Sequence, residues 1–441
     1  MDELRADVLV VGGGMGGLTV AGTAAERGAT VVVLDVAPEP GGSAALSEGY
    51  VWTAPSPEVF AEQDPDGDAD RFAVMLDGLP EALDWVAGLG VTTGPWLTGV
   101  LGYGEGRQID IAHHLRRCRA LVSGAGGWVL PGSEVTELLG GPGGDVYGAE
   151  VRQAATGQRM RVLAPATVLA TGGFQASPSL RDERLFPGAS ALVPRTNPHS
   201  DGAGLRLGTA AGAATVDTPG FYGHLVPNPL DVFEPPDYAR LAQYHSEHGL
   251  LLDAEGARFT DESLGDHMAT QEVARRGTAL LVVDERVRRE QVMRPFIAGM
   301  DAVDKMAEAG RRGARYAGAP TLAGLAAAVA GWGYPEAGVR AAVESFNAGV
   351  FSVPRRNFRT PLAEPPYAAV EVRAAITFTY GGLATDDTGR VLAPSGAPVR
   401  GLYAAGVDAG GFNVRGYTGG LVRGLVLGRR TGLALTKGLD R

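Results

Sequence analysis

Three glycines and one acid near the N-terminus have the types and spacing to hold a diphosphate and a ribose. Gly12, Gly14 and Gly17 lie in the segment GGGMGG, and Asp35 follows Gly17 by 18 residues. In such a pattern the first glycine permits a tight turn, the second lets the backbone approach a pyrophosphate, and the third lets a helix pack closely on a strand. A carboxylate at position 35 can accept hydrogen bonds from ribose hydroxyls. These four residues predict a dinucleotide site.

The segments around these residues predict the elements that position them. Residues 7–11 (DVLVV) form a continuous apolar run, which indicates a strand buried on both faces. The segment LTVAGTAAERG favours a helix ending at Gly28, and TVVVLD at 30–35 favours a second buried strand ending in the acid. The order strand, glycines, helix, strand and acid supports the dinucleotide interpretation. It leaves FAD and NAD open.

A second glycine pair, Gly41 and Gly42, follows the acid in the segment PEPGGSAALSEGYVW at 38–52. By itself this segment could be a plain glycine-rich turn. Its arrangement resembles FAD proteins of the fumarate reductase and succinate dehydrogenase flavoprotein superfamily, in which a Gly-Gly-Ser/Thr segment passes along the flavin. The resemblance implies FAD as the cofactor, with Ser43 as a further contact. No histidine follows Gly42, so the resemblance implies that FAD is held without a covalent bond.

The same resemblance extends along most of the chain. Its further motifs, in order, are VLATGGF, SDGAGLRLG, ARFTDE, LVVDERVR, TYGGLATDDTGRVL and APVRGLYAAG. The implied fold is α/β, with a Rossmann-like FAD-binding domain at 1–217 and 365–441 and an inserted α+β capping domain at 218–364. Either Ser200 or Asp201 is expected to cap the helix that follows. The other implied FAD contacts are Val135, Ala170, Thr171, Gly172, Asp201, Gly406 and Gly420.

Family chemistry implies roles for three residues of the capping domain. Such enzymes move a hydride between flavin N5 and one carbon of a C–C bond, and a proton at the neighbouring carbon. His224 stands where the family has a substrate-binding histidine, or is a plain histidine of the cap. Arg288 stands where the cap arginine is expected, or is a solvated helix residue. Glu262 matches a relay glutamate, but the relay arginine expected after it is absent from SLGDH.

The implied carboxylate-binding residues are replaced in this chain. Phe378 stands in place of a histidine and Tyr417 in place of an arginine, with Arg415 two positions away. This pattern resembles tricarballylate and 3-ketosteroid dehydrogenases, and it argues against a small symmetric dicarboxylate. A neutral phenol can donate a hydrogen bond to a keto oxygen, so Tyr417 is expected to polarise the substrate, or else it packs beside the flavin. Tyr380 is a second candidate for proton transfer, although a phenol titrates near 10 and would need activation.

The expected function is an FAD-dependent enzyme that desaturates a Cα–Cβ bond next to a ketone or carboxyl of a small substrate. The reverse reaction, an ene-reductase using FADH2, would use the same residues. A flavin-binding module without catalysis is an alternative of another class. The electron acceptor is left open, since the sequence has no haem or iron–sulfur cysteine motif, and no metal site is expected.

Composition limits the remaining possibilities. The 441 residues are 45% hydrophobic with a net charge of −11, which argues against nucleic acid or an anionic membrane as the main partner. The arginine pairs at 116/117, 288/289 and 355/356 are expected on solvated faces. Cys118, the single cysteine, excludes a disulfide framework and is expected in a core. No apolar run has the length of a membrane span, and a strand starting by residue 7 leaves no room for a signal peptide, so a cytoplasmic protein is expected.

Overall fold

The computed structural model describes residues 2–140, 144–230, 232–295 and 302–437, which form two compact units. Unit 1 comprises Met1–Ser190, Thr196–Phe221 and Phe378–Arg441, and unit 2 comprises Ala191–Arg195 and Tyr222–Thr377. Each unit buries its own hydrophobic core. The last change of unit, between Thr377 and Phe378, falls inside a long strand, β18 (Tyr367–Thr379).

A six-stranded sheet forms the centre of unit 1. Its neighbours pair in parallel except at the β20 edge, and the order is β20 (Arg390–Leu392), β21 (Pro398–Ala404), β11 (Ala166–Leu169), β2 (Val8–Val11), β3 (Val31–Leu34) and β7 (Trp128–Leu130). Every residue of β2 and β3 is buried, which confirms the two strands expected from their apolar runs. A parallel sheet covered on both faces requires such runs, because neither side of the strand meets water.

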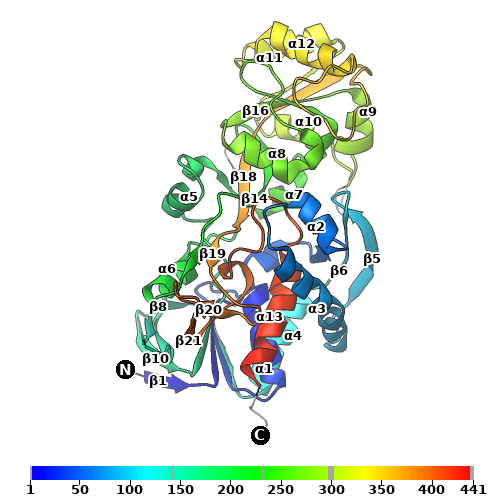
Figure 1. Ribbon diagram of the computed structural model, residues 1–441. Helices are drawn as coiled ribbons and strands as arrows, with labels where there is room; N and C mark the ends of the chain where they lie inside the picture. The colour runs from blue at the N-terminus through cyan, green and yellow to red at the C-terminus, as the bar shows by residue number, and fades with distance from the viewer. Residues whose placement is uncertain (1, 141–143, 231, 296–301, 438–441) are drawn as a thin grey trace. The chain divides into compact units, whose positions relative to one another are not determined.

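The helix expected after the first strand is α1 (Met15–Glu26), and α13 (Leu421–Leu435) packs along it (Figure 1). Glycines of α13, four residues apart, lie at the contact. A Cβ on Gly424 would lie 3.0 Å from the side chain of Met15, and one on Gly432 would lie 2.8 Å from Cβ of Thr23. The helices therefore approach closely only because this face of α13 has no side chains. The neighbouring helices are α2 (Pro57–Gln63), α3 (Ala69–Gly88) and α4 (Ile111–Gly124).

Smaller sheets complete unit 1. A four-stranded sheet has the order β1 (Asp2–Arg5), β10 (Arg159–Leu163), β9 (Gly148–Gln153) and β8 (Ser133–Leu139). The alternation of apolar and polar residues at 128–139 and 145–171 favours strands of one small meander, but the first and last strands of these segments, β7 and β11, join the central sheet. A three-stranded sheet and a two-stranded one have the orders β4 (Tyr50–Thr53), β6 (Gly104–Ile109), β5 (Thr93–Val100) and β13 (Thr215–Val216), β19 (Gly382–Leu383).

The helix α6 (Ala203–Ala210) starts later than the sequence indicates. Its N-cap is Gly202, with φ of +90°, so the expectation of Ser200 or Asp201 as N-cap is wrong. The left-handed backbone at Gly202 turns the chain into the helix, a conformation that glycine adopts without strain. Asp201 still contributes, because its Oδ1 accepts a hydrogen bond from the Ala203 N–H at 3.1 Å. The other helix nearby is α5 (Pro178–Arg184).

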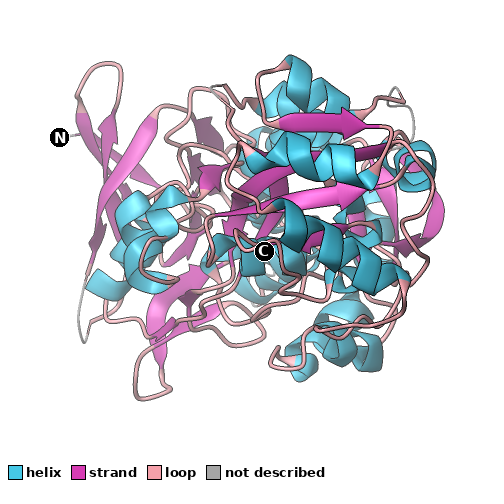
Figure 2. Cartoon of the chain, turned by 90° about the horizontal axis from the view of Figure 1, so that it is seen from above, coloured by secondary structure: helices cyan, strands magenta, loops and turns pink. Residues whose placement is uncertain are grey.

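Unit 2 is built on β18. The path β12 (Val193–Pro194), β18, β16 (Thr278–Val283), β15 (Leu250–Leu252) forms its sheet, and β14 (Phe221–Pro227) and β17 (Tyr316–Ala319) also pair with β18. Figure 2 shows the strands and helices of the chain from a second direction. The helices of unit 2 are α7 (Pro235–Leu241), α8 (Asp266–Ala274), α9 (Glu285–Val287), α10 (Lys305–Arg311), α11 (Leu322–Ala330) and α12 (Glu336–Asn347).

In unit 2, the sequence of 321–333 favours a helix with a threonine cap, and the apolar spacing at 339, 343 and 346 favours a helix with one buried face; the structure has both. Thr321 caps α11, because its hydroxyl accepts a hydrogen bond from the Gly324 N–H at 3.0 Å. In α12, Val339, Val343 and Phe346 are buried together on one face. A helical repeat of apolar residues thus identifies the face that meets the core.

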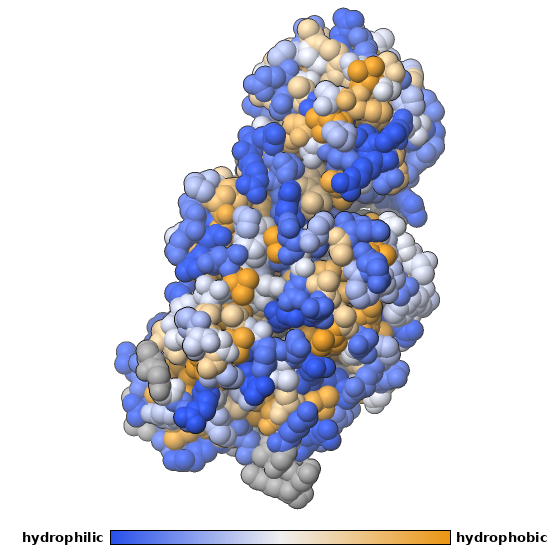
Figure 3. Space-filling model, in the orientation of Figure 1, coloured by the Kyte–Doolittle hydropathy of each residue, from blue (hydrophilic) through white to orange (hydrophobic). Residues whose placement is uncertain are grey.

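The surface is mixed in character. On the face drawn in Figure 3, hydrophilic and hydrophobic residues are interspersed. In the part of the chain that the structure describes, no helix combines the length and the apolar character needed to cross a membrane. Cys118 is fully buried in the core of unit 1, as expected.

Candidate active site

The glycines at the end of β2 form a turn that tolerates no side chain at two positions. Gly12 has a φ of +107°, and a Cβ there would lie 2.2 Å from the carbonyl oxygen of Ala170. A Cβ on Gly17 would lie 1.9 Å from the carbonyl oxygen of Gly12. The turn, the helix α1 and the strand β11 therefore pack as closely as the glycine spacing predicts.

Gly14 differs from its neighbours because protein packing does not require it. A Cβ on Gly14 would have its nearest neighbour, the Cα of Gly42, at 3.8 Å. Gly14 is also the N-cap of α1, and no side chain caps this helix end. The N-terminal amides of α1 thus border an open space that a side chain on Gly14 would fill, and we call this space the cradle. Such a space suits the pyrophosphate of a dinucleotide. The residues present fit FAD at this place.

Asp35 lies directly after β3 and organises the same turn. Its Oδ2 accepts a hydrogen bond from the Gly13 N–H at 2.7 Å, and its Oδ1 accepts one from the Ala37 N–H at 2.8 Å. Burial raises the pKa of Asp35, and these two hydrogen bonds oppose the rise. Because a carboxylate has about four lone-pair sites, Asp35 retains acceptor capacity for ribose hydroxyls.

Ala170, Thr171 and Gly172 follow β11 and are held by an acid that the sequence did not single out. The carboxylate of Asp408 accepts hydrogen bonds from the backbone N–H groups of Thr171 and of Gly173, the latter at 3.1 Å. Asp408 is 2% exposed, and burial raises its pKa. It belongs to a short helical turn that begins at the predicted contact Gly406. The ends of β11 and β21 are thereby tied together.

The remaining predicted FAD contacts occupy varied positions in unit 1. Gly42 and Ser43 begin a short 3₁₀ helix (Gly42–Leu46) that follows Gly41. Val135 lies in β8, opposite Val151 of β9. Asp201 is half-exposed and forms an ion pair with Arg206 at 3.2 Å.

Aromatic rings gather around the predicted substrate tyrosine. The ring centroid of Tyr417 lies 5.3 Å from that of Trp52 and 5.9 Å from that of Phe378, both in edge-to-face geometry. The ring of Phe378 lies 5.8 Å from that of Tyr380. Tyr103 lies 6.0 Å from Trp52 and donates a hydrogen bond to the carbonyl oxygen of Tyr417. We call these five residues the aromatic cluster; it brings together Tyr380 and Tyr417, both predicted from the sequence.

The hydroxyl of Tyr417 lies at the start of α13. The Gly420 N–H donates a hydrogen bond to Tyr417 Oη at 3.2 Å, and Gly420 is the N-cap of this 15-residue helix. A helix N-terminus carries a partial positive charge. The phenol of Tyr417 is therefore held where negative charge is favoured.

A buried acid, Asp64, shapes the loop that carries Tyr417. Its Oδ2 accepts hydrogen bonds from Nδ2 of Asn413 at 3.1 Å and from the Val414 N–H at 2.8 Å. Its Oδ1 accepts one from the Arg415 N–H at 2.9 Å. Asp64 is 1% exposed. Its hydrogen bonds therefore hold residues 413–415 in place.

Tyr380 is fully buried, and its hydroxyl has no hydrogen-bond partner among the residues that the structure describes. Burial raises the pKa of Tyr380 well above its usual value, with the charge of Asp64 adding to the effect. The phenol is therefore held neutral, which suits hydrogen-bond donation better than proton abstraction.

His224, in β14 of unit 2, is paired with an acid. Its Nδ1 lies 2.5 Å from Oδ2 of Asp266, and the Leu225 N–H donates to the other oxygen, Oδ1, at 3.1 Å. Burial raises the pKa of Asp266 to about 7. Burial lowers the pKa of His224 well below its usual value, and the charge of Arg195 adds to this effect. The two groups therefore form a hydrogen-bonded pair that is buried from water.

Glu262 lies in a separate cluster and binds two arginines. Its Oε2 accepts from Arg258 Nη2 at 2.7 Å and from Arg355 Nη1 at 2.6 Å, while its Oε1 accepts from Arg258 Nε at 3.1 Å. The Leu251 N–H donates to Oε1 at 2.9 Å. The expectation that Arg355 lies on a solvated face is wrong: its side chain is fully buried because it neutralises Glu262. Neither arginine was singled out as a partner of Glu262.

Arg288 is partly exposed and is held by two acids. Its Nε lies 2.8 Å from Glu285 Oε2, and its Nη1 lies 2.5 Å from Asp304 Oδ2. These hydrogen bonds raise the pKa of Arg288. Among the described residues, no hydrogen bond or ion pair joins any two of His224, Glu262 and Arg288.

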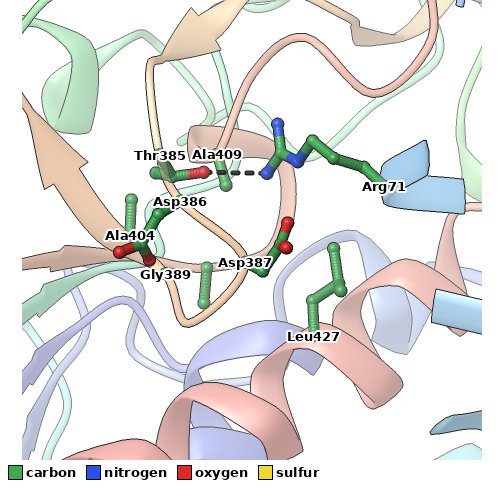
Figure 4. Close-up of a pocket in the computed structure, with 9 residues that line it drawn as sticks. Arg71, Thr385, Asp386, Asp387, Gly389, Ala404, Ala409 and Leu427 are labelled. Atoms are coloured by element: carbon green, nitrogen blue, oxygen red, sulfur yellow. Dashed lines mark hydrogen bonds between the residues drawn. The ribbon is translucent and has the colours of Figure 1, made fainter. Parts of the chain in front are cut away.

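A small pocket of unit 1 is lined by residues other than those predicted from the sequence (Figure 4). Arg71 projects into it from α3, and its guanidinium donates to Thr385 Oγ1 at 2.8 Å and to the carbonyl oxygen of Gly410 at 2.9 Å. None of the predicted FAD contacts or substrate residues lines it. The lining residues are Arg71, Thr385, Asp386, Asp387, Gly389, Ala404, Ala405, Ala409 and Leu427.

Comparison with known proteins identifies the cofactor. Residues 7–420 match the family described as "FAD binding domain". The chain belongs to this family. FAD is therefore the cofactor, and the resemblance to the fumarate reductase flavoproteins is confirmed.

Individual relatives are more distant. The chain is 26% identical to the NADH:fumarate oxidoreductase of Klebsiella pneumoniae (strain 342) over 94% of its own length, but it spans only 45% of that protein. It is 25% identical to the 4-oxocyclohexanecarboxylate 2-dehydrogenase of Sinomonas cyclohexanicum, over 94% of this chain and 89% of that protein.

A solved structure shows the same mixed α/β fold. The 3-ketosteroid-delta4-(5alpha)-dehydrogenase from Rhodococcus jostii RHA1, in complex with 4-androstene-3,17-dione, superposes with a TM-score of 0.77 at 21% identity. The match covers 99% of this chain and 98% of that one.

Proposed function

We propose that this flavoprotein desaturates a Cα–Cβ bond next to a ketone or carboxyl of a small organic substrate. The observation that carries the proposal is the position of Tyr417, a neutral phenol in the aromatic cluster, held by the Gly420 N–H at the start of α13. Removing a proton beside a carbonyl places negative charge on its oxygen. A phenol and a helix N-terminus both stabilise such charge.

The cofactor supplies hydride transfer, and the chain supplies binding and charge stabilisation. The open cradle at Gly14 and the uncapped start of α1 would hold the pyrophosphate, and Asp35 the ribose. We assign unit 1 to the Rossmann-like FAD-binding domain expected at 1–217 and 365–441. We assign unit 2 to the capping domain expected at 218–364.

A ketone is favoured over a dicarboxylate as substrate. Phe378 and Tyr417 are uncharged, and both stand where the family resemblance implies residues that bind a carboxylate. Neither ring offers a cation to pair with a carboxylate, and a carboxylate that loses water without such a pair is costly. Two similar proteins, a 4-oxocyclohexanecarboxylate 2-dehydrogenase and a 3-ketosteroid-delta4-(5alpha)-dehydrogenase, are named for ketone substrates, which supports this choice.

Anaerobic mixing tests the proposal. The FAD-loaded protein is mixed with 4-oxocyclohexanecarboxylate, with a saturated 3-ketosteroid and with succinate, and loss of the visible absorption of oxidised FAD is recorded. We expect a ketone to reduce the flavin faster than succinate does. Reduction only by added dithionite, followed by reoxidation with an enone, would instead establish the ene-reductase direction. No reaction in either direction would leave the non-catalytic flavin module.

Replacing Tyr417 by Phe tests the residue that carries the proposal. Because the hydroxyl is the group that would donate to the substrate oxygen, we expect the rate of flavin reduction to fall by about 10²–10³-fold, as for other oxyanion donors. FAD content and the melting temperature should stay unchanged, since the ring contacts remain. Tyr403→Phe, a phenol removal in β21 of the same unit, is the matched control.

Two further properties follow from the chain's own residues. Ser43 rather than a histidine follows Gly42, so acid precipitation should release all FAD into the supernatant. A cytoplasmic location stays a prediction, supported by the single buried cysteine, Cys118. The electron acceptor is not assigned.

A further inference from the structure

The loop before α13 carries Tyr417 and lies directly against the backbone of two other elements of unit 1. A Cβ on Gly416 would lie 2.5 Å from the carbonyl oxygen of Gln63, the last residue of α2. A Cβ on Gly419 would lie 2.0 Å from the carbonyl oxygen of Trp52 in β4. Glycines on both sides of Tyr417 thus bring the loop as close to α2 and β4 as a backbone can come.

Asp64 follows α2 directly and holds the start of this loop with both carboxylate oxygens. Oδ1 accepts the Arg415 N–H, and Oδ2 accepts the Val414 N–H together with Nδ2 of Asn413. Because Asp64 is 1% exposed, these three donors stand where water would otherwise solvate the carboxylate. Only a carboxylate offers acceptor sites on two oxygens that point in different directions.

Asn413 extends the network to the residue after Tyr417. Its Nδ2 also donates to Thr418 Oγ1 at 3.3 Å, and the side chains of Asn413 and Thr418 are both buried. The two ends of the turn 413–418 therefore meet at the Asn413 amide, and Asp64 fixes that amide.

The place of the Tyr417 hydroxyl depends on this turn. The Gly420 N–H donates to Tyr417 Oη at 3.2 Å, and Tyr103 donates to the carbonyl oxygen of Tyr417. Because N–H···O bonds usually span about 2.7–3.2 Å, the first of these is already at the upper end of the range. A small shift of the turn would therefore break the contact between the phenol and the start of α13.

We propose that Asp64 is a positioning residue for the desaturation: its carboxylate sets the turn 413–418 so that the Tyr417 hydroxyl is held by Gly420 and donates to the substrate oxygen. This rests on the proposed function. Asp64 moves no proton itself, because the N–H groups of the turn occupy both of its oxygens. It acts through Tyr417, and its effect on the rate disappears once the Tyr417 hydroxyl is removed.

Asp64→Asn keeps the size of the side chain and removes one acceptor. The amide has a single oxygen, so it cannot accept the N–H groups of Val414 and Arg415 at their present positions, and its NH2 group must face one of them. The turn moves to separate these two donors. Because a displacement of about 1 Å can slow catalysis about 10²-fold, we expect flavin reduction at saturating ketone to slow by about 10–10²-fold.

A double-mutant cycle with Tyr417→Phe distinguishes positioning from a general loss of structure. Residues that act as a unit have non-additive effects on the rate, so Asp64→Asn should slow the Tyr417→Phe protein by less than about threefold. An equal slowing in both backgrounds overturns the proposal, because Asp64 then acts independently of the Tyr417 hydroxyl. A wild-type rate in Asp64→Asn overturns it as well.

Thr418→Val is a milder variant of the same network and carries the cycle if Asp64→Asn does not fold. It removes the hydroxyl that accepts from Asn413 and leaves Asp64 in place. We expect flavin reduction to slow by about threefold to tenfold, the equivalent of one lost hydrogen bond, and to be unaffected by this change in the Tyr417→Phe background. Equal slowing in the two backgrounds would again contradict positioning.

A further readout needs no substrate. In FAD-loaded protein labelled with 3-fluorotyrosine, Tyr417→Phe identifies the ¹⁹F NMR signal of Tyr417. Asp64→Asn and Thr418→Val should shift this signal. Asp386→Asn should not, and it is the matched control because Asp386 also holds a turn of unit 1 by accepting backbone N–H groups.

The ¹⁹F signal separates failure of the proposal from failure of the proposed function. An unshifted Tyr417 signal in both Asp64→Asn and Thr418→Val overturns the positioning role, whatever the substrate. If no ketone reduces the flavin of the wild type, the proposed function fails, while the signal still decides whether Asp64 sets the place of Tyr417.

Discussion

Glu262→Gln distinguishes a structural role for Glu262 from the relay role that the family resemblance implies. In the structure this carboxylate is fully buried and accepts three hydrogen bonds from two arginines, with N–O distances of 2.7, 2.6 and 3.1 Å. It also accepts the Leu251 N–H at 2.9 Å. If its main task is to neutralise these arginines, the substitution should destabilise unit 2 before it alters the chemistry.

The magnitude follows from the burial of all three charges. The side chains of Arg258 and Arg355 are 3% and 0% exposed, so neither guanidinium can turn to water when the anion is lost. Breaking a buried ion pair by removing one partner costs about 3–5 kcal/mol. Two cations share this anion, and the NH2 group of Gln would face guanidinium N–H groups, so the upper part of that range is expected. For a unit of this size the loss corresponds to roughly 6–20 °C in melting temperature.

Thermal unfolding of the FAD-loaded protein, followed by calorimetry, measures this effect. Glu344→Gln is the matched control, because it makes the same change at an ion pair with Arg340 that is about half exposed on both sides. That substitution should cost less than about 0.5 kcal/mol. A Glu262→Gln protein that melts within about 1 °C of the wild type, yet has lost turnover, would refute the structural role of Glu262 and favour its relay role.

Two further predictions concern the glycine turn and the buried histidines. Gly14→Ala should fold normally, because its Cβ would have its nearest protein atom at 3.8 Å. Since this Cβ enters the cradle, titration calorimetry should show FAD binding weakened by more than about tenfold. Gly17→Ala should also destabilise the apoprotein, because its Cβ would lie 1.9 Å from a backbone oxygen. Equal losses of FAD affinity and of apoprotein stability in the two variants would contradict the assignment of the cradle to FAD. Burial lowers the pKa of His245 to about 3, so the unfolded chain binds a proton below pH 6.5 that the native chain does not, and stability is lost as the pH falls from 6.5 toward 3. His245→Gln should therefore reduce the loss of unfolding free energy between pH 6.5 and pH 5 by about 2 kcal/mol in urea titrations; an unchanged loss would contradict the assignment.

Local patterns in the sequence were sufficient to predict the elements around the expected FAD site. The buried strands β2 and β3, the helix α1 and the glycine turn between them all follow from residues within about 30 positions of each other. Each such pattern carries its own physical requirement, either an apolar run buried on both faces or a backbone that must approach another closely. The buried face of α12 and the Thr321 cap were predictable for the same reason.

Charged residues with distant partners could not be predicted. Arg355 is 93 residues from Glu262, and Asp64 is 349 residues from Asn413, and no spacing rule connects either pair. A single arginine or aspartate has the same local appearance in a solvated loop and in a buried network. Arg355 was accordingly misassigned to a solvated face, whereas its neighbour Arg356 is exposed as expected.

The sequence by itself determined the glycine turn after β2, because the backbone packing at Gly12 and Gly17 excludes a side chain, and its family motifs pointed to FAD. The family resemblance also predicted that Phe378 and Tyr417 stand in place of charged substrate residues. Only the tertiary structure decided the charge states and partners: that Asp266 holds His224, that two arginines hold Glu262 and that Asp408 ties β11 to β21. The physical reason is that an ionisable group takes its pKa and its role from burial and from neighbours that the fold brings together.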